Sequence, residues 1–318
     1  MSNLVDSLAS GHEGTVKDQL TAYVRRLKGG EMGSVPAVFA IIVLTLMFQI
    51  ASPFFITKLN FANLFVQSAE LTMLAAALVF VILLAEIDLA AGVTAGVAMA
   101  VYIQLVKQQG WALIPALTAA FLVGIVIGAV IGFLVAKIGV PSFVVTLAFF
   151  LGFQGMQLVL LGEGGVYRVE DEKVLAIMNQ NLPQWGGWFM LAVCLGISYL
   201  IGLWDRRRRA VTGLVNKPIS ILYMKLAGLG LIGAVSVYFL NQNRSQGSIP
   251  ILGVPIVVPI TIVILFIGTF VLDRTRFGRH LYAVGGNPEA ARRAGINVKR
   301  IRTSAFVLCS SLAAIAGM

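Results

Sequence analysis

Charged residues are scarce in this sequence. Only 12% of its 318 residues are charged, whereas 58% are hydrophobic. A typical soluble domain carries about one quarter charged residues, so this chain has too few charges to cover a surface in water. The composition therefore excludes an ordinary soluble protein, and we expect a membrane protein.

Cysteine and histidine are also rare, which excludes several kinds of site. Cys194 and Cys309 lie inside apolar stretches without CxxC or Cys/His spacing, so we expect them to pack in the core and to form neither a disulfide framework nor a metal site. His12 and His280 lack partner residues at motif spacing. Walker A, GxSxG, HExxH and EF-hand patterns are absent too. The sequence thus predicts no catalytic residues, no metal and no cofactor.

Long uncharged stretches predict the fold class. A helix needs about 20 apolar residues to cross the hydrocarbon core of a bilayer. We expect an all-α, polytopic transmembrane helical bundle with eight complete spans at residues 33–57, 61–85, 89–106, 111–136, 142–161, 186–204, 219–240 and 255–272. A ninth span begins at Thr303 and contains only 16 residues. We therefore expect this span to be truncated and a complete version to carry more helices.

The basic residues indicate the orientation. If residues 1–32 form a cytoplasmic N-terminal tail, alternation puts 19 of the 24 basic residues on the cytoplasmic side and 5 outside. Because the cytoplasmic loops of membrane proteins are enriched in Lys and Arg, we expect a cytoplasmic N-terminus and a transmembrane domain over residues 33–318. The formal charge of +10 is then a topology signal, and it does not indicate a nucleic-acid partner.

Two spans carry glycines at four-residue spacing, namely Gly92 and Gly96 in the third and Gly124, Gly128 and Gly132 in the fourth. This spacing removes side chains from one helix face and lets a neighbouring backbone approach closely. The pattern predicts helix packing and no chemistry.

Three acidic residues lie where a charge is costly. Glu70 falls inside the second span, and Glu86 and Asp88 lie at its end. A carboxylate at the bilayer centre costs about 2.5 to 3.5 kcal/mol on insertion scales, so each is a candidate for lining a translocation path. Two alternatives stay open. Glu86 and Asp88 are also suited to cap the third helix, and Glu70, with Gln67 one turn earlier, is suited to an interhelical hydrogen bond.

A polar segment of about 30 residues, 273–302, separates the eighth and ninth spans. Connections between packed helices commonly need only 2 to 8 residues. A segment of this length therefore indicates a role beyond joining two helices. Within it, Asn287 is a good N-cap, Pro288 suits the first helical position, Glu289 favours the first turn, and Gly295 suits the position after the end. These signals predict a complete helix of two turns.

The predicted helix has a charged side and a small, smooth side. Glu289 and Arg293 are spaced as an i, i+4 pair, while the smooth side consists of Ala290, Ala291 and Ala294. Alanine is too small to anchor a helix in lipid. We expect this face to enter a groove on another protein, and the alternative is a passive surface connector.

At this point the sequence resembles a known family. The string from Thr275 to Arg292, TRFGRHLYAVGGNPEAAR, which continues to Val298, is similar to the permease subunits of bacterial sugar-importing ABC transporters for ribose, xylose, arabinose and galactose. Supporting matches are EIDLAAG at residues 86–92, although Ala90 stands where Ser is usual, and VPSFVVTL at residues 140–147. Within the family, the AEID string and an arginine-rich loop after the sixth span resemble the xylose-type permeases.

The resemblance implies the permease subunit of an ATP-driven importer of sugars, of the pentose or xylose type, in the bacterial inner membrane. It implies a homodimer of permeases in membrane lipid, a separate ABC ATP-binding subunit, and a periplasmic or extracytoplasmic sugar-binding protein. ATP hydrolysis belongs to the partner, so the chain itself is not an enzyme. The resemblance assigns the coupling to the ATPase to residues Gly285, Gly286, Asn287, Pro288, Glu289, Ala290, Ala291, Arg292 and Gly295.

A transporter of a different class is the alternative. An ion-coupled secondary transporter needs ionisable groups inside its spans, and Glu70, Glu86 and Asp88 keep this possibility open. The sequence alone does not identify the sugar.

Overall fold

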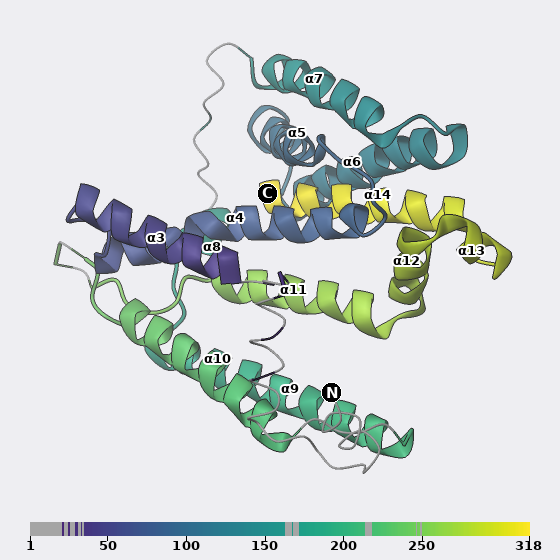
Figure 1. Cartoon of the computed structure of the whole chain (residues 1–318). Coiled ribbons are helices and arrows are strands. Elements are labelled where there is room, and N and C mark those ends of the chain that lie inside the picture. The colour runs from purple at the N-terminus through teal and green to yellow at the C-terminus, as the bar shows by residue number, and fades with distance from the viewer. Residues whose placement is uncertain are drawn as a thin grey trace. The chain divides into compact units, whose positions relative to one another are not determined.

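The computed structural model describes residues 35–162, 172–213, 218–245, 247–248 and 250–318, together with residues 21, 25, 29, 30, 33 and 167. Its helices are α3 (Val35–Ala51), α4 (Lys58–Ile82), α5 (Ala91–Ile103), α6 (Leu113–Phe133), α7 (Ser142–Leu161), α8 (Glu172–Asn179), α9 (Gln184–Val211), α10 (Ile219–Leu240), α11 (Val257–Arg274), α12 (Arg276–Gly286), α13 (Pro288–Arg293) and α14 (Val298–Gly317) (Figure 1). Short π-helical segments, Gln104–Gln108 and Leu134–Ile138, extend α5 and α6. In the described residues no strand forms beyond a single bridge between Asn181 and Pro255.

The helices confirm the all-α, polytopic class. Six of the described helices are long and apolar enough to cross a membrane, namely α4, α6 with its π-helical extension, α7, α9, α10 and α11. The expected boundaries at 142–161 and 219–240 match α7 and α10. Other boundaries differ from the expectation. Helix α9 continues to Val211 through the arginine-rich segment, and α14 begins at Val298 because Asn297 caps it by accepting a hydrogen bond from the Arg300 N–H at 3.0 Å.

The chain divides into two compact units. Residues 1–64 and 181–255 form one unit, which contains α3, the first turns of α4, α9 and α10. Residues 65–180 and 256–318 form the other, which contains the rest of α4, α5 to α8 and α11 to α14.

Helix α14 is the centre of the second unit and runs beside α6 (Figure 1). A Cβ on Gly128 would lie 2.6 Å from the Phe306 carbonyl oxygen, and one on Gly124 would lie 2.6 Å from the Ala314 Cβ. At Gly132, the carbonyl oxygen accepts a hydrogen bond from the Thr303 hydroxyl at 3.2 Å. The predicted packing role of the glycine row is confirmed.

The helices around α14 complete this core. Phe306 is fully buried and packs with residues of α4, α5 and α6, among them Val81, Val97 and Ile131. Helices α12 and α13 lie at the N-terminal end of α14 (Figure 1). The polar segment between the last two expected spans is therefore folded, and it packs against the same helix that fills the core.

Candidate functional site

Helix α13 has the caps that its sequence predicts. Asn287 is extended, with φ −155° and ψ 99°, and its side-chain oxygen accepts a hydrogen bond from the Ala290 N–H at 2.9 Å. Pro288 occupies the first helical turn, where its missing N–H costs nothing. After the helix end, Gly295 adopts φ +82°, a left-handed conformation that glycine reaches without a Cβ penalty. Local sequence chemistry therefore determines where this short helix begins and ends.

The charged side of α13 faces outward. Glu289 forms ion pairs with Arg292 at 2.8 Å and with Arg293 at 3.5 Å, and all three side chains are more than half exposed. Exposed pairs of this kind contribute about 0.3 to 0.5 kcal/mol each. They stiffen the helix slightly and leave its charged surface available for a partner.

The alanine side of α13 differs from the expectation. Ala291 is 4% exposed and packs with Leu281, Val284 and other residues of the protein's own core, whereas Ala290 and Ala294 are exposed. One of the three alanines therefore attaches the helix to the protein. Only the other two remain for a groove on another protein.

Helix α12 brings this segment against the C-terminal end of α4. The backbone of Gly285 lies so close to the Leu83 carbonyl oxygen that a Cβ at position 285 would collide with it. A Cβ at position 286 would meet open space. Leu281 and Val284 are buried beside Phe80 of α4 and Leu84, which follows the end of that helix. Glycine at position 285 is therefore required by the close approach.

The turn after α4 carries two of the predicted acidic residues, and both have partners. Arg302 of α14 donates a hydrogen bond to the Glu86 carboxylate and forms an ion pair with it. Asp88 is 8% exposed, and it accepts hydrogen bonds from the Ala90 N–H at 2.9 Å and from the Cys309 thiol at 3.5 Å. Both carboxylates are therefore engaged within the protein. Neither caps α5, because its N-cap residue is Ala90 and has no side-chain cap hydrogen bond.

The first turn of α7 also holds this connection. The Ser142 hydroxyl accepts a hydrogen bond from the Ile87 N–H at 3.2 Å, and the Thr146 hydroxyl donates to the Ile87 carbonyl at 3.2 Å. Ala85 has φ +57° and is the one non-glycine residue with positive φ in the described part of the chain. Such a conformation costs free energy and persists only where surrounding contacts enforce it. The turn is therefore tightly specified.

Glu70 behaves differently from the other two acids. It lies on an exposed face of α4 and makes no hydrogen bond or ion pair within the part of the chain that the structure describes, and Gln67 one turn earlier is exposed as well. Within the described residues, Glu70 and Gln67 do not make the interhelical hydrogen bond that the sequence left open.

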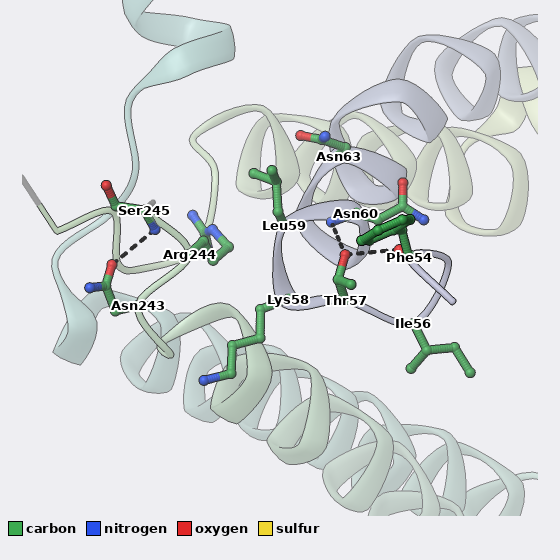
Figure 2. Close-up of a pocket in the computed structure, with 10 residues that line it drawn as sticks. All are labelled: Phe54, Ile56, Thr57, Lys58, Leu59, Asn60, Asn63, Asn243, Arg244 and Ser245. Atoms are coloured by element: carbon green, nitrogen blue, oxygen red, sulfur yellow. Dashed lines mark hydrogen bonds between the residues drawn. The ribbon is translucent and has the colours of Figure 1, made fainter. Parts of the chain in front are cut away.

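A pocket of about 600 Å³ lies in the unit of residues 1–64 and 181–255 (Figure 2). It falls in the range of 300 to 1,000 Å³ that is usual for small-molecule sites. Seven of its ten lining residues are polar, and the lining comprises Phe54, Ile56, Thr57, Lys58, Leu59, Asn60, Asn63, Asn243, Arg244 and Ser245. They come from the α3–α4 connection, the start of α4 and the segment after α10.

Sequence reasoning missed this pocket. Its walls are 180 residues apart in the sequence, and no aromatic cluster marks it. A usable signal was present, because Asn60, Asn63, Gln67 and Glu70 recur at spacings of three and four residues within an otherwise apolar helix. That spacing puts all four on one face of α4.

Comparison with known proteins identifies the family. Residues 60–318 match the family described as "Branched-chain amino acid transport system / permease component". The chain belongs to this permease family. No solved structure matches it.

Its relatives include sugar permeases. The xylose transport system permease protein XylH of Escherichia coli (strain K12) is 34% identical over 267 residues, which are 83% of this chain and 65% of that protein. The Haemophilus influenzae XylH is 31% identical over 282 residues, 88% of this chain and 73% of that protein. The ribose import permease protein RbsC of Escherichia coli (strain K12) is 28% identical over 282 residues, 89% of this chain and 67% of that protein.

These matches confirm the resemblance read from residues 275–298. The relatives are named as transport permeases and not as enzymes. With its membrane-crossing helices, the permease is a multi-pass protein of the bacterial inner membrane. The chain spans less than two thirds of the length of the E. coli xylose permease.

Proposed function

We propose that this permease forms the translocation path of an ATP-driven importer of sugars, with a pentose of the xylose type as substrate. The observation that carries this proposal is the similarity to permeases named for xylose over more than four fifths of the chain. The energy comes from a separate ABC ATP-binding subunit, a sugar-binding protein delivers the substrate outside, and a second permease completes a homodimer.

The coupling to the ATPase is assigned to α12 and α13. The charged side of α13 and the exposed Ala290 are free to enter a groove on the ATPase, while Ala291 and Gly285 attach the segment to the permease. Through Gly285 the segment touches the end of α4, directly before the turn that Arg302 and Ser142 hold. A displacement of α13 therefore reaches α4, α7 and α14 through direct contacts.

The proposed topology has eight complete spans and a ninth, with a cytoplasmic N-terminus. Contacts between loops support the alternation. On the proposed cytoplasmic side, the turn at Ile87 contacts Ser142, and Leu83 contacts Gly285. On the proposed outer side, the Gln104 amide donates to the Leu160 carbonyl.

The other unit supports the same alternation. Arg244, from the loop after α10, donates to the side chain of Asn181, from the segment before α9, at 2.9 Å. Both segments are assigned to the outer side, and loops on opposite sides of a bilayer about 30 Å thick cannot make such a contact.

Glu70 is proposed to line the path, because a carboxylate in a spanning helix that has no partner among the described residues needs water, substrate or another subunit beside it. Glu86 and Asp88 are assigned a supporting role, since their carboxylates are engaged within the protein. The relatives give no support to an ion-coupled carrier, because they are named as permeases of xylose transport and ribose import systems.

Reconstitution of the complete transporter in proteoliposomes tests the proposal. Uptake of D-xylose is expected to require ATP on the side of the ATPase and to continue in the presence of an uncoupler. Uptake that follows a proton or sodium gradient without ATP would instead establish the secondary transporter.

A further inference from the structure

The pocket lined by residues from 54–63 and 243–245 lies among segments assigned to the outer side, and it is called the outer pocket here. Many of its polar atoms form hydrogen bonds to other residues of the protein. The Arg244 side chain is 6% exposed, and its guanidinium donates to the Leu240 and Gly253 carbonyls and to Asn181. The Thr57 hydroxyl donates to the Phe54 carbonyl at 2.9 Å. These groups fix the shape of the pocket and are not available to a ligand.

Several groups remain for a ligand, among them the Asn63 amide, the Asn243 NH₂ and the Phe54 ring. Asn63 is exposed and makes no hydrogen bond to the described part of the chain. Asn243 uses its Oδ1 to accept the N–H groups of Ser245 and Ile251 at 3.0 and 3.2 Å, which leaves its amide NH₂. The ring of Phe54 is available too, because this residue is 74% exposed. Figure 2 shows these residues on different sides of the pocket.

The charge of the lining selects the class of ligand. None of the described residues that line the pocket carries a carboxylate, so this lining offers a cation no counter-charge. The Arg244 guanidinium is bonded to the protein itself. The Lys58 side chain extends away from Asn63 in Figure 2. These two cations therefore do not converge on one place where an anion would bind. Carboxamides both donate and accept hydrogen bonds. An uncharged polyhydroxyl molecule is the class that fits amides beside an aromatic ring.

We propose that this outer pocket is an acceptor site for a monosaccharide. The inference rests on the proposed function, because the pocket lies outside only in the proposed orientation. Sugar released from a binding protein is received by Asn63 and Asn243.

Pocket occupancy is tested by cysteine protection in the complete transporter. Leu59→Cys reports on the pocket without removing a polar group, and Gln109→Cys, in another exposed outer segment, is the control. Both are made with Cys194→Ala, while Cys309 is fully buried. A membrane-impermeant thiol reagent is expected to label both variants from outside, and D-xylose or D-ribose should protect Leu59→Cys alone by at least about five-fold. Equal labelling with and without sugar would overturn the site.

Transport stoichiometry gives an independent test. Asn63→Leu is expected to lower D-xylose taken up per ATP hydrolysed by about five-fold, as for one lost neutral hydrogen bond, while ATP hydrolysis stimulated by the sugar-loaded binding protein stays normal. Ser68→Ala, whose hydroxyl bonds only within its own helix at 3.2 Å, should match the wild type. Normal stoichiometry in Asn63→Leu would overturn the site, whereas absence of ATP-driven uptake in the wild type would overturn the proposed function.

Discussion

Arg302 and Glu86 form an ion pair that joins the start of α14 to the turn between α4 and α5. The two residues are 216 positions apart, and their side chains are 31% and 12% exposed. The pair lies beside the place where Gly285 of α12 meets Leu83. It therefore connects the element proposed to bind the ATPase with three helices of the core.

Reversing the charges one at a time tests this connection. Glu86→Arg or Arg302→Glu should each lower the free energy of unfolding in detergent by about 2 to 3 kcal/mol, because one partner of a partly buried pair is left beside a like charge. The double variant Glu86→Arg with Arg302→Glu should recover at least half of the lost free energy of unfolding. It should also recover at least half of the sugar-stimulated ATP hydrolysis that the single variants lose. If the double variant is as impaired as the sum of the single ones, the pair does not act as a unit.

The contact between α6 and α14 predicts an asymmetry between glycines. Gly128→Ala should destabilise the protein by about 1 to 3 kcal/mol, because a Cβ there overlaps the backbone of α14. Gly152→Ala in α7 is the matched control, since the space around it is open and alanine favours helix. Thermal unfolding of both variants in the same detergent provides the measurement. Equal unfolding temperatures would contradict the close packing.

The end of α13 predicts a backbone effect. Gly295→Val should strain or fray the helix by about 1 to 2 kcal/mol, because φ is +82° and a β-branched residue rarely adopts it. Gly295→Asn should be close to the wild type, since asparagine tolerates the left-handed region. Both variants should reach the membrane normally, and ATPase co-purification should fall only for valine. If ATPase co-purification also fell in the asparagine variant, the position would require the absence of any side chain, and backbone conformation alone would not explain the effect.

The orientation predicts a pattern of labelling. Cysteines placed at Arg207 and Arg300 should resist a membrane-impermeant reagent in intact cells and react after permeabilisation. Cysteines at Lys58 and Gln109 should react in both conditions. Strong labelling of Arg207→Cys or Arg300→Cys in intact cells would overturn the assignment that the basic loops make.

Local features of the site could be predicted from the sequence, and contacts between distant residues could not. The caps Asn287 and Gly295 act on backbone within a few residues, so residue type and spacing were sufficient. The partners Arg302 and Cys309 of the acidic turn come from a helix more than 200 positions away, and nothing local marks them.

The helix periodicity also left one choice open. It put Ala290, Ala291 and Ala294 on one side of α13, but a helix of two turns is anchored by whichever residue the tertiary structure buries. That residue is Ala291. The outer pocket was missed for the same reason, because its walls meet only in the folded chain.

The most direct test of the coupling role is sugar-stimulated ATP hydrolysis by the complete transporter carrying Ala290→Trp. The indole should fill the small exposed surface of α13 and block its seating, so hydrolysis should fall by at least about ten-fold, corresponding to about 1.4 kcal/mol of lost stabilisation, with normal abundance in the membrane. Ala210→Trp, an exposed alanine of α9 on the same proposed side, should leave hydrolysis unchanged. Normal stimulated hydrolysis and D-xylose uptake in Ala290→Trp would show that α13 is a passive connector.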